Sequence, residues 1–282
     1  MKTQVAIVQF RAEAFDAGGN RRRTLDLVEE AAAAGARLVV LPELAISGYQ
    51  LERAGLLRSA EEINGPTLEA WSGAARRHGV WIAGGFCERQ GDRLFNSAML
   101  VGPDGLAGHY QKLHLFDSEK LIFAPGERGL SVYQTPIGRI GICVCYDLRF
   151  VEVARVLALA GADLIAVPTA WVRGFDPKPR DAMGYIGQAR GAILQANLNQ
   201  VYIAIASQCG RVGTTEFLGS SLIADPYGTV LEGPMGDDEE RIAVAEFDTA
   251  VAEASRVRSP LVRPREDRRT DVYAVASGGK QY

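Results

Sequence analysis

The chain has 282 residues, of which 47% are hydrophobic and 23% are charged, and its formal net charge is -3. This composition is typical of a globular protein with enough apolar material for one large core. The charge gives no basic footprint for nucleic acid, and no stretch approaches the roughly twenty apolar residues of a membrane helix. We therefore expect neither a nucleic acid nor a membrane as a partner.

The cysteines indicate free thiols. They are spread along the chain without metal-ligand spacing, and two of them would point to opposite faces of one strand: Cys87, Cys143, Cys145 and Cys209. The apolar run near the amino terminus is too short for a secretory signal. We expect no bound metal and a reducing, cytoplasmic setting.

The first part of the chain indicates strands that alternate with helices. Gln4–Gln9 is predicted as a strand, Asn20–Ala34 as a helix, and Arg37–Leu41 as a buried strand that ends at Pro42. Glu43 would then be a carboxylate at the carboxyl end of a strand. The alternative is a solvated loop glutamate or a partner for a nearby arginine, although the apolar residues that follow make an unpaired charge costly.

A second charged residue, Lys112, lies at the end of a predicted hairpin. After a helix over 66–78 and a strand over 80–85, Leu94–Val101 and Leu106–Lys112 flank a Pro-Asp-Gly turn and read as the two arms. Lys112 ends the second arm. The segment 113–126 is predicted as an ordered loop with at most one helical turn, and long ordered loops are more often functional than not.

Cys145 follows a third apolar strand. Ile140–Val144 is predicted as a buried strand and the next residues as a helix to about Ala160, with Asp147 as its N-cap. Amides just after Cys145 would then lack intrahelical partners and could bind an anion, which suits a nucleophile. The alternative is that Cys145 is a small buried hydrophobe, the usual state of a free cysteine.

The remainder adds predicted elements of the same kind and a basic tail. The elements are a strand over 163–167, a helix over Asp181–Leu198, and strands over 201–206, 217–224, 229–231 and 241–247. The tail carries arginines and prolines, but acidic residues interrupt it, which favours a subunit-contacting arm over a nucleic-acid patch. We expect one domain over residues 1–258 and a carboxyl-terminal arm over 259–282 that contacts a neighbouring subunit.

Glu43, Lys112 and Cys145 thus stand at the ends of strands, which we expect to be neighbours in one sheet. Each has an ordinary structural explanation, but together they supply the roles of acyl transfer. A thiolate attacks, a carboxylate moves protons, and an ammonium stabilises the oxyanion.

At this point the sequence resembles the nitrilase superfamily of carbon–nitrogen hydrolases. The segments that carry the resemblance occur in the family's order and span nearly the whole chain: 41–43, 110–115, 141–150, 168–171, 219–221, 225–228 and 267–273. The resemblance implies an α/β fold, an α-β-β-α sandwich that packs further on dimerisation.

The resemblance also implies the site. Glu43 would be the general base and acid, Lys112 would hold the oxyanion, Cys145 would be the nucleophile, and Glu119 would orient substrate and Lys112. The residues expected to bind substrate are Tyr49, Tyr146, Thr169, Ala170 and Trp171.

The implied reaction is hydrolysis of a small carboxamide to a carboxylate and ammonia through a thioester, without metal or organic cofactor. Hydrolysis of an N-carbamoyl amide is the alternative. Nitrile hydrolysis is less favoured because Tyr146-Asp147 follows the cysteine where nitrilases usually have Trp-Glu. A catalytically silent binding homologue is opposed by the intact set of candidate residues. The resemblance also implies a homodimer or higher oligomer formed through helices near 150–160 and 183–197.

Overall fold

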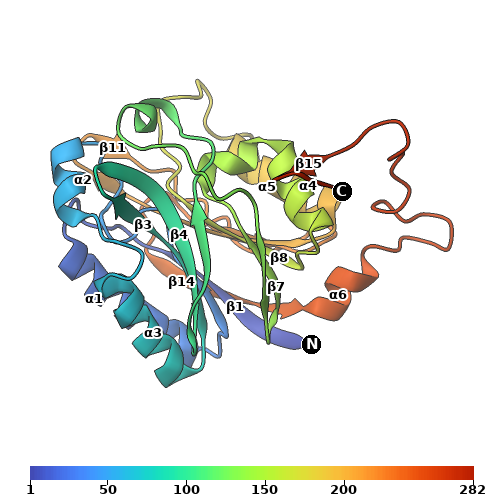
Figure 1. Cartoon of the computed structure of the whole chain (residues 1–282), viewed down its shortest axis with the longest axis horizontal. Helices are drawn as coiled ribbons and strands as arrows, with labels where there is room; N and C mark the ends of the chain where they lie inside the picture. The colour runs from blue at the N-terminus through green and yellow to red at the C-terminus, as the bar shows by residue number, and fades with distance from the viewer.

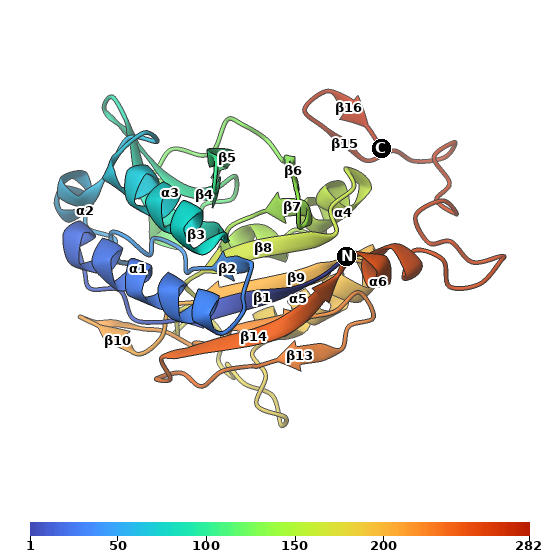
Figure 2. The same ribbon diagram turned by 90° about the horizontal axis from the view of Figure 1, so that it is seen from below.

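The chain folds into two six-stranded sheets that lie face to face between two helical layers (Figure 1). The computed structural model describes residues 1–282. Helices α1 and α3 cover the first sheet, and α4 and α5 cover the second (Figure 2). This is the α-β-β-α order expected from the sequence. None of the helices is both long and apolar enough to cross a membrane.

Each of the two sheets contains six strands, three of which are parallel neighbours. The first runs β14 (Arg241–Asp248), β1 (Lys2–Gln9), β2 (Leu38–Val40), β3 (Trp81–Gln90), β4 (Arg93–Gly102) and β5 (Gly105–Gln111). The second runs β13 (Val230–Glu232), β12 (Leu222–Ala224), β9 (Tyr202–Ser207), β8 (Leu164–Thr169), β7 (Gly138–Ile142) and β6 (Val132–Thr135). The helices are α1 (Ala17–Ala33), α2 (Arg53–Ser59), α3 (Pro66–His78), α4 (Val151–Leu159), α5 (Gly187–Asn199) and α6 (Thr249–Ala254).

Side chains that alternate along β1 pack on the two opposite faces of the first sheet. In β1, Val5 and Ile7 pack into the core between the sheets, whereas Ala6 and Val8 pack against the α1 and α3 layer. Because both faces are covered, the strand is apolar at every one of these positions.

In each sheet, parallel strands have their carboxyl ends at the same edge. β1, β2 and β3 are parallel, as are β7, β8 and β9. Helices connect these strands, so within each sheet their carboxyl ends lie together. The two edges meet, since the backbone N–H of Glu43 after β2 donates to the carbonyl of Thr169 in β8 at 3.3 Å.

Two predicted helices begin later than expected. The helix after Cys145 begins at Val151, because a 3-10 turn over Cys145–Arg149 comes first. Helix α5 begins at Gly187 rather than Asp181, whose side chain instead accepts hydrogen bonds from the N–H groups of Met183 and Tyr185. Such side-chain turns compete with helix formation.

Two strand predictions also need correction. Only Leu222–Ala224 of the strand predicted over 217–224 is regular, because Gly219 and Ser220 have φ of 49° and 64°, which break an extended strand. Strand β6 was not predicted, because its half-buried residues lie at a sheet edge and carry little apolar signal.

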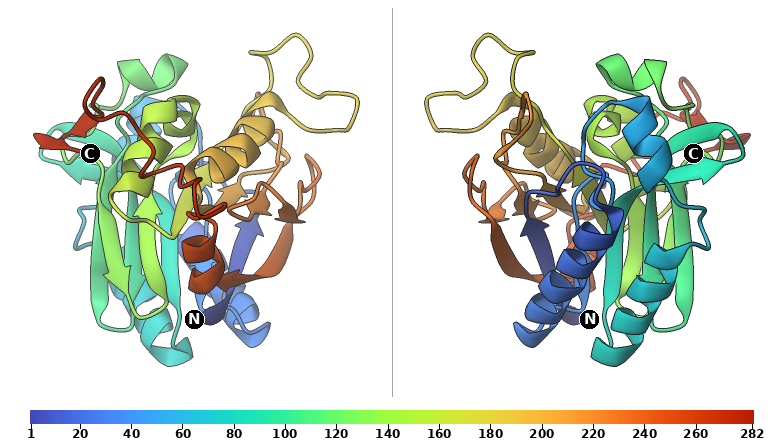
Figure 3. Two further views of the ribbon diagram at one scale, coloured as in Figure 1. Left: turned by 90° about the vertical axis from the view of Figure 1, so that its right-hand side faces the viewer. Right: turned by 90° about the vertical axis from the view of Figure 1, so that its left-hand side faces the viewer.

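The carboxyl-terminal segment after α6 runs past the ends of α4 and α5 and ends in a short hairpin, β15 (Ala276–Ser277) with β16 (Lys280–Gln281) (Figure 3). Arg265 ties it to the body, donating to the carbonyls of Ala158 at 2.7 Å and Asn199 at 2.7 Å. The arm is therefore attached at the carboxyl ends of both helices.

Candidate active site

Cys145 stands where the second sheet gives way to a tight turn. Strand β7 ends at Ile142, and Cys145 opens the 3-10 turn with φ of 48°, in the left-handed region. Residues other than glycine seldom adopt this conformation, and such strain gathers at functional sites. The residue is 8% exposed.

Asp147 holds this turn in place. Its fully buried carboxylate accepts from the N–H of Val144 at 3.0 Å, the N–H of His114 at 2.9 Å and the hydroxyl of Tyr110 at 2.7 Å. The prediction that Asp147 caps the following helix is therefore wrong, since it ties the turn to the segment after β5. A 3-10 turn begins at Cys145, and the α-helix begins only at Val151.

Lys112 lies between two carboxylates. Its Nζ donates to Glu43 Oε1 at 2.6 Å and to Glu119 Oε1 at 2.8 Å, and all three side chains are fully buried. Asn96 Nδ2 donates to Glu43 at 2.7 Å, and the Tyr49 hydroxyl donates to Glu119 at 2.7 Å. One ammonium and several neutral donors thus hold two carboxylates whose charges would otherwise be costly to bury.

The three strand-end residues do not come from one sheet, as we had expected. Glu43 follows β2 and Lys112 follows β5, both in the first sheet, whereas Cys145 follows β7 in the second. They meet because the sheets are stacked with matching edges. Strands β3 and β4 separate β2 from β5, and Asn96 on β4 bridges that gap.

A glycine on β3 leaves room for Glu43. A Cβ at Gly85 would lie 2.8 Å from the Cα of Glu43 and 2.5 Å from the backbone nitrogen of Leu44. Both contacts are closer than van der Waals packing allows and involve backbone, so the chain after β2 can approach β3 only past glycine.

The electrostatics give each group a distinct protonation state. Burial raises the pKa of Glu43 to about 7, although Lys112 opposes the rise, while Glu119 adds to it. Burial opposes the charge on Lys112, but Glu43 and Glu119 outweigh it and raise the pKa of the ammonium. Burial and then Glu43 raise the pKa of the Cys145 thiol. At neutral pH the cluster therefore holds a thiol, an ammonium and a carboxylate close to its midpoint.

Glu43 keeps one free acceptor. Its Oε1 is bonded to Lys112 and Asn96, while its Oε2 is buried without a hydrogen-bond partner. A buried oxygen without a donor is a ready proton acceptor, because an added proton removes the cost of leaving its charge unsatisfied.

A cavity of about 410 Å³ opens beside Cys145. Three of the residues expected to bind substrate line it: Tyr146, Ala170 and Trp171. Of the candidate catalytic residues, Cys145 lines this cavity. The other three, Glu43, Lys112 and Glu119, have fully buried side chains and do not line it.

Two other predicted contacts lie elsewhere. Tyr49 lines an adjoining cavity of about 490 Å³, and Thr169 is buried in β8. The rings of Phe116 and Phe175, whose centroids are 4.5 Å apart, belong to the walls of both cavities. The aromatic pair therefore divides the space in front of the site.

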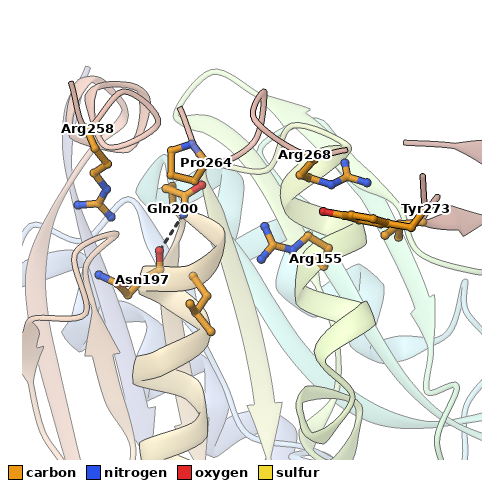
Figure 4. A pocket seen from close by; sticks show the side chains of 9 residues that line it. Arg155, Asn197, Gln200, Arg258, Pro264, Arg268 and Tyr273 are labelled. Carbon is orange, nitrogen blue, oxygen red and sulfur yellow. Dashed lines mark hydrogen bonds between the residues drawn. The ribbon is translucent and has the colours of Figure 1, made fainter. Parts of the chain in front are cut away.

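A larger cavity of about 610 Å³ lies under the carboxyl-terminal arm (Figure 4). Arg155 from α4 and Arg268 and Tyr273 from the arm line it, and none of the predicted site residues does. It shares Leu198 with the Cys145 cavity. Volume alone therefore does not locate the chemistry.

Sequence reasoning missed Asn96 and the turn-holding role of Asp147. A signal for Asn96 was present, since asparagine is unfavourable inside an apolar strand and Asn96 follows Phe95 in the predicted hairpin. The role of Asp147 had no local signal, because two of its three partners lie more than thirty residues away.

Comparison with known proteins extends these observations. The profile of the carbon-nitrogen hydrolase family matches residues 4–257. A nitrilase from Pyrococcus abyssi is 37% identical over 272 residues, 96% of this chain and 98% of the relative. An omega-amidase from Danio rerio is 32% identical over 290 residues, 98% of each chain. The crystal structure of an amidase from Nesterenkonia sp. superposes with a TM-score of 0.79 at 26% identity, covering 96% of this chain and 94% of that one.

Proposed function

The chain belongs to the carbon-nitrogen hydrolase family, and we propose that it is a cysteine amidase that hydrolyses the C–N bond of a small carboxamide to a carboxylate and ammonia. The observation that carries the proposal is Lys112 held between Glu43 and Glu119, close enough to Cys145 for Glu43 and Lys112 to act on the pKa of its thiol. It supplies a nucleophile, a base and a fixed positive charge in one buried cluster.

In the first half-reaction, Cys145 Sγ adds to the amide carbonyl carbon and its proton passes to Glu43 Oε2. The ammonium of Lys112 and the backbone N–H of Tyr146 stabilise the oxyanion. The C–N bond then breaks, Glu43 returns the proton to the leaving nitrogen, and ammonia and a thioester result.

In the second half-reaction, Glu43 takes a proton from water, which attacks the thioester carbonyl. The C–S bond breaks, Glu43 returns its proton to the thiolate, and the acid loses its remaining proton to solvent and leaves as a carboxylate. Glu119, held by Tyr49, keeps Lys112 in position throughout. Tyr146, Ala170 and Trp171 contact the substrate, and Thr169 supports them from β8.

Relatives support amide chemistry. The names omega-amidase and (R)-stereoselective amidase belong to relatives 32% and 33% identical to this chain. A mutant of the Nesterenkonia sp. AN1 amidase carries acrylamide added to its active-site cysteine.

The test is ammonia release from a panel of carboxamides, N-carbamoyl amino acids and nitriles. We expect carboxamides to be the best substrates, and Cys145→Ala to lose turnover while its melting temperature stays within a few degrees. Cys143→Ala, two residues away in the core, is the matched control and keeps its activity. Hydrolysis retained by Cys145→Ala would remove the assignment.

We further propose a homodimer formed through α4 and α5, with the arm from Ser259 reaching a neighbouring subunit. Leu194 and Leu198 on α5 are 61% and 55% exposed, and Leu261 on the arm is 91% exposed, which favours a covered surface. Four free cysteines support a reducing, cytoplasmic setting. Light scattering that gave a monomer mass at micromolar concentration would contradict the dimer.

A further inference from the structure

Thr169 carries a buried hydroxyl that no group in the structure satisfies. The residue lies at the end of β8 and is fully buried, and its Oγ1 has no hydrogen-bond partner. Earlier residues of the same strand, such as Ala166 and Val167, are part of the apolar core, and a valine would match the shape of threonine without the hydroxyl. A buried hydroxyl without a partner lowers stability, so its presence in a folded protein calls for a functional explanation.

Strand register places Thr169 beside the nucleophile. β7 and β8 are parallel neighbours in which Ile142 pairs with Ala166, and Cys145 and Thr169 both stand three residues beyond that pair. The residue after Thr169, Ala170, lines the same cavity as Cys145. The ends of two adjacent strands therefore bring the hydroxyl and the thiol together.

The hydroxyl acts on the sulfur of Cys145. Burial raises the pKa of the thiol most, and Glu43 adds to the rise. Lys112, the backbone N–H of Ala170 and the hydroxyl of Thr169 oppose the rise, the last two by hydrogen bonding. In the resting thiol the contact from Thr169 is not a complete hydrogen bond. Catalytic hydrogen bonds often tighten only as the reaction proceeds, and a negative sulfur is a stronger acceptor than a thiol.

The backbone of Thr169 is fixed by both sheets. Its carbonyl accepts from the N–H of Glu43, which follows β2, at 3.3 Å and from the N–H of Gln208, which follows β9, at 3.1 Å. The hydroxyl is thus held on a rigid strand end and not on a loop. A donor that is in place before the reaction begins costs no reorganisation when charge develops.

Lys112 has no N–H group to spare for the sulfur in the proposed reaction. An ammonium has three N–H groups. Glu43 and Glu119 accept two of them, at 2.6 and 2.8 Å, and the oxyanion takes the third. The thiolate that forms when Glu43 removes the proton therefore needs other donors, and the same holds when the C–S bond of the thioester breaks.

We propose, resting on the amidase function above, that Thr169 is a catalytic residue whose hydroxyl donates a hydrogen bond to the Cys145 sulfur as the thiolate forms. Its own proton stays on the Thr169 oxygen, while the proton of the thiol passes to Glu43. The N–H of Ala170 is the second donor, so two fixed groups stabilise the sulfur in both half-reactions. This role differs from the substrate contact that the family resemblance implied for Thr169.

The first experiment follows alkylation of Cys145 by iodoacetamide, measured by peptide mass between pH 6 and 10. Thr169→Val removes the hydroxyl at nearly the same volume and should raise the pKa of the thiol by roughly one to two. Alkylation at pH 8 should slow about 3- to 12-fold, which is less than the loss of thiolate because a thiolate of higher pKa is the better nucleophile. Thr169→Ser keeps the hydroxyl and should react within about twofold of the wild type. The other titratable groups that act on the sulfur stay unchanged: Glu43, Lys112, Tyr49 and Cys143.

The second experiment compares turnover with stability. Thr169→Val should lower kcat for amides roughly 10- to 100-fold. Its melting temperature should stay the same or rise, because the variant removes an unsatisfied polar group. Thr24→Val on α1 is the matched control, since the hydroxyl of Thr24 is also buried but bonds the carbonyl of Arg21 at 2.8 Å and the indole N–H of Trp71 at 3.0 Å. That control should melt lower and keep its kcat. If Thr169→Val melts lower and loses no more kcat than Thr24→Val, the hydroxyl is structural and the inference falls.

Other roles of the hydroxyl give different results. In the Cys145→Ala background, calorimetry with butyramide should show the same affinity with and without Thr169→Val. If that change weakens butyramide binding and alkylation of the wild-type thiol does not depend on it, Thr169 contacts substrate and the inference falls. If Thr169→Val lowers activity only on the acid side of pH 7 and leaves alkylation unchanged, the hydroxyl serves Glu43 and the inference falls.

The alkylation measurement also separates this inference from the amidase function, because it requires no amide hydrolysis. If no amide is hydrolysed but alkylation slows as expected in Thr169→Val, the function falls and the role of Thr169 at the sulfur stands. If amides are hydrolysed and alkylation is unchanged, the role of Thr169 falls and the function stands.

Discussion

The acid limb of the pH profile tests the proposed role of Glu43 most directly. Burial places the pKa of this carboxyl at about 7 instead of its ordinary 4.5. As the base for the free enzyme, Glu43 must be ionised, so kcat/KM should halve near pH 7. At pH 5 about 1% of the carboxyl is ionised, which predicts a fall of about 100-fold. With an ordinary pKa of 4.5, the fall at pH 5 would be less than about 1.5-fold.

A substitution of Glu119 tests whether the pKa of Glu43 sets this acid limb. Its charge raises the pKa of Glu43, so Glu119→Gln should move the acid limb to lower pH. The maximum rate should also fall, because Lys112 loses one of its two carboxylate partners. The direction of the shift is the decisive readout, since a merely structural role of Glu119 would lower the rate without moving the limb.

The assay is ammonia release from the best amide between pH 5 and 9, with circular dichroism at each pH. Acid unfolding through Glu43 itself is not expected. A carboxyl whose pKa is raised on folding stabilises the fold below the unfolded value, and that stability is lost as pH rises through about 7. Glu127→Gln, an exposed carboxylate beside Arg93, is the control and should leave the limb in place. A wild-type profile that is flat down to pH 5 would refute the reasoning.

Three further substitutions test the residues that hold the candidate active site in place. Lys112→Met leaves the two buried carboxyls of Glu43 and Glu119 without their shared cation, so urea denaturation should show a loss of about 3–5 kcal/mol together with lost turnover; unchanged stability would show that these pairs are not buried in solution. Asp147→Asn weakens the hydrogen bonds that hold the nucleophile turn and should cost about 1–3 kcal/mol and lower kcat; a wild-type kcat would argue against positioning by this turn. Gly85→Ala pushes on Glu43 and should cost about 1–3 kcal/mol and most of the activity, whereas Gly73→Ala should be neutral or stabilising; equal effects of the two would refute the close approach at β3.

Apolar patterning predicts most of the sheet framework. β1, β2 and the β4–β5 hairpin lie within two residues of the predicted strands, because period-two burial is encoded locally, whereas β3 runs five residues beyond its predicted end. The start of α5 was placed six residues early because the turn made by Asp181 depends on which backbone groups its side chain meets. Such competition between a side chain and the helix is not visible in periodicity.

The candidate site could be identified residue by residue but not assembled. The sequence indicated Glu43, Lys112 and Cys145, because charges and a thiol at strand ends stand out against apolar runs, whereas Glu119 was implied by the family resemblance alone. Their distribution over two sheets could not be predicted, since strand order and the stacking of sheets depend on long-range contacts. Asn96 was overlooked for the same reason, as its partners follow β2 and β5.

Because the cluster is divided between two stacked sheets, its geometry depends on the distance between those sheets. The thiol is fixed to one sheet and the proton acceptor to the other, so the distance between them is set by the side chains packed in between, such as Val5, Ile7 and Ile142. A misplacement of about 1 Å can cost on the order of 100-fold in rate. Substitutions in that shared core, far from any substrate, should therefore impair turnover before they unfold the protein.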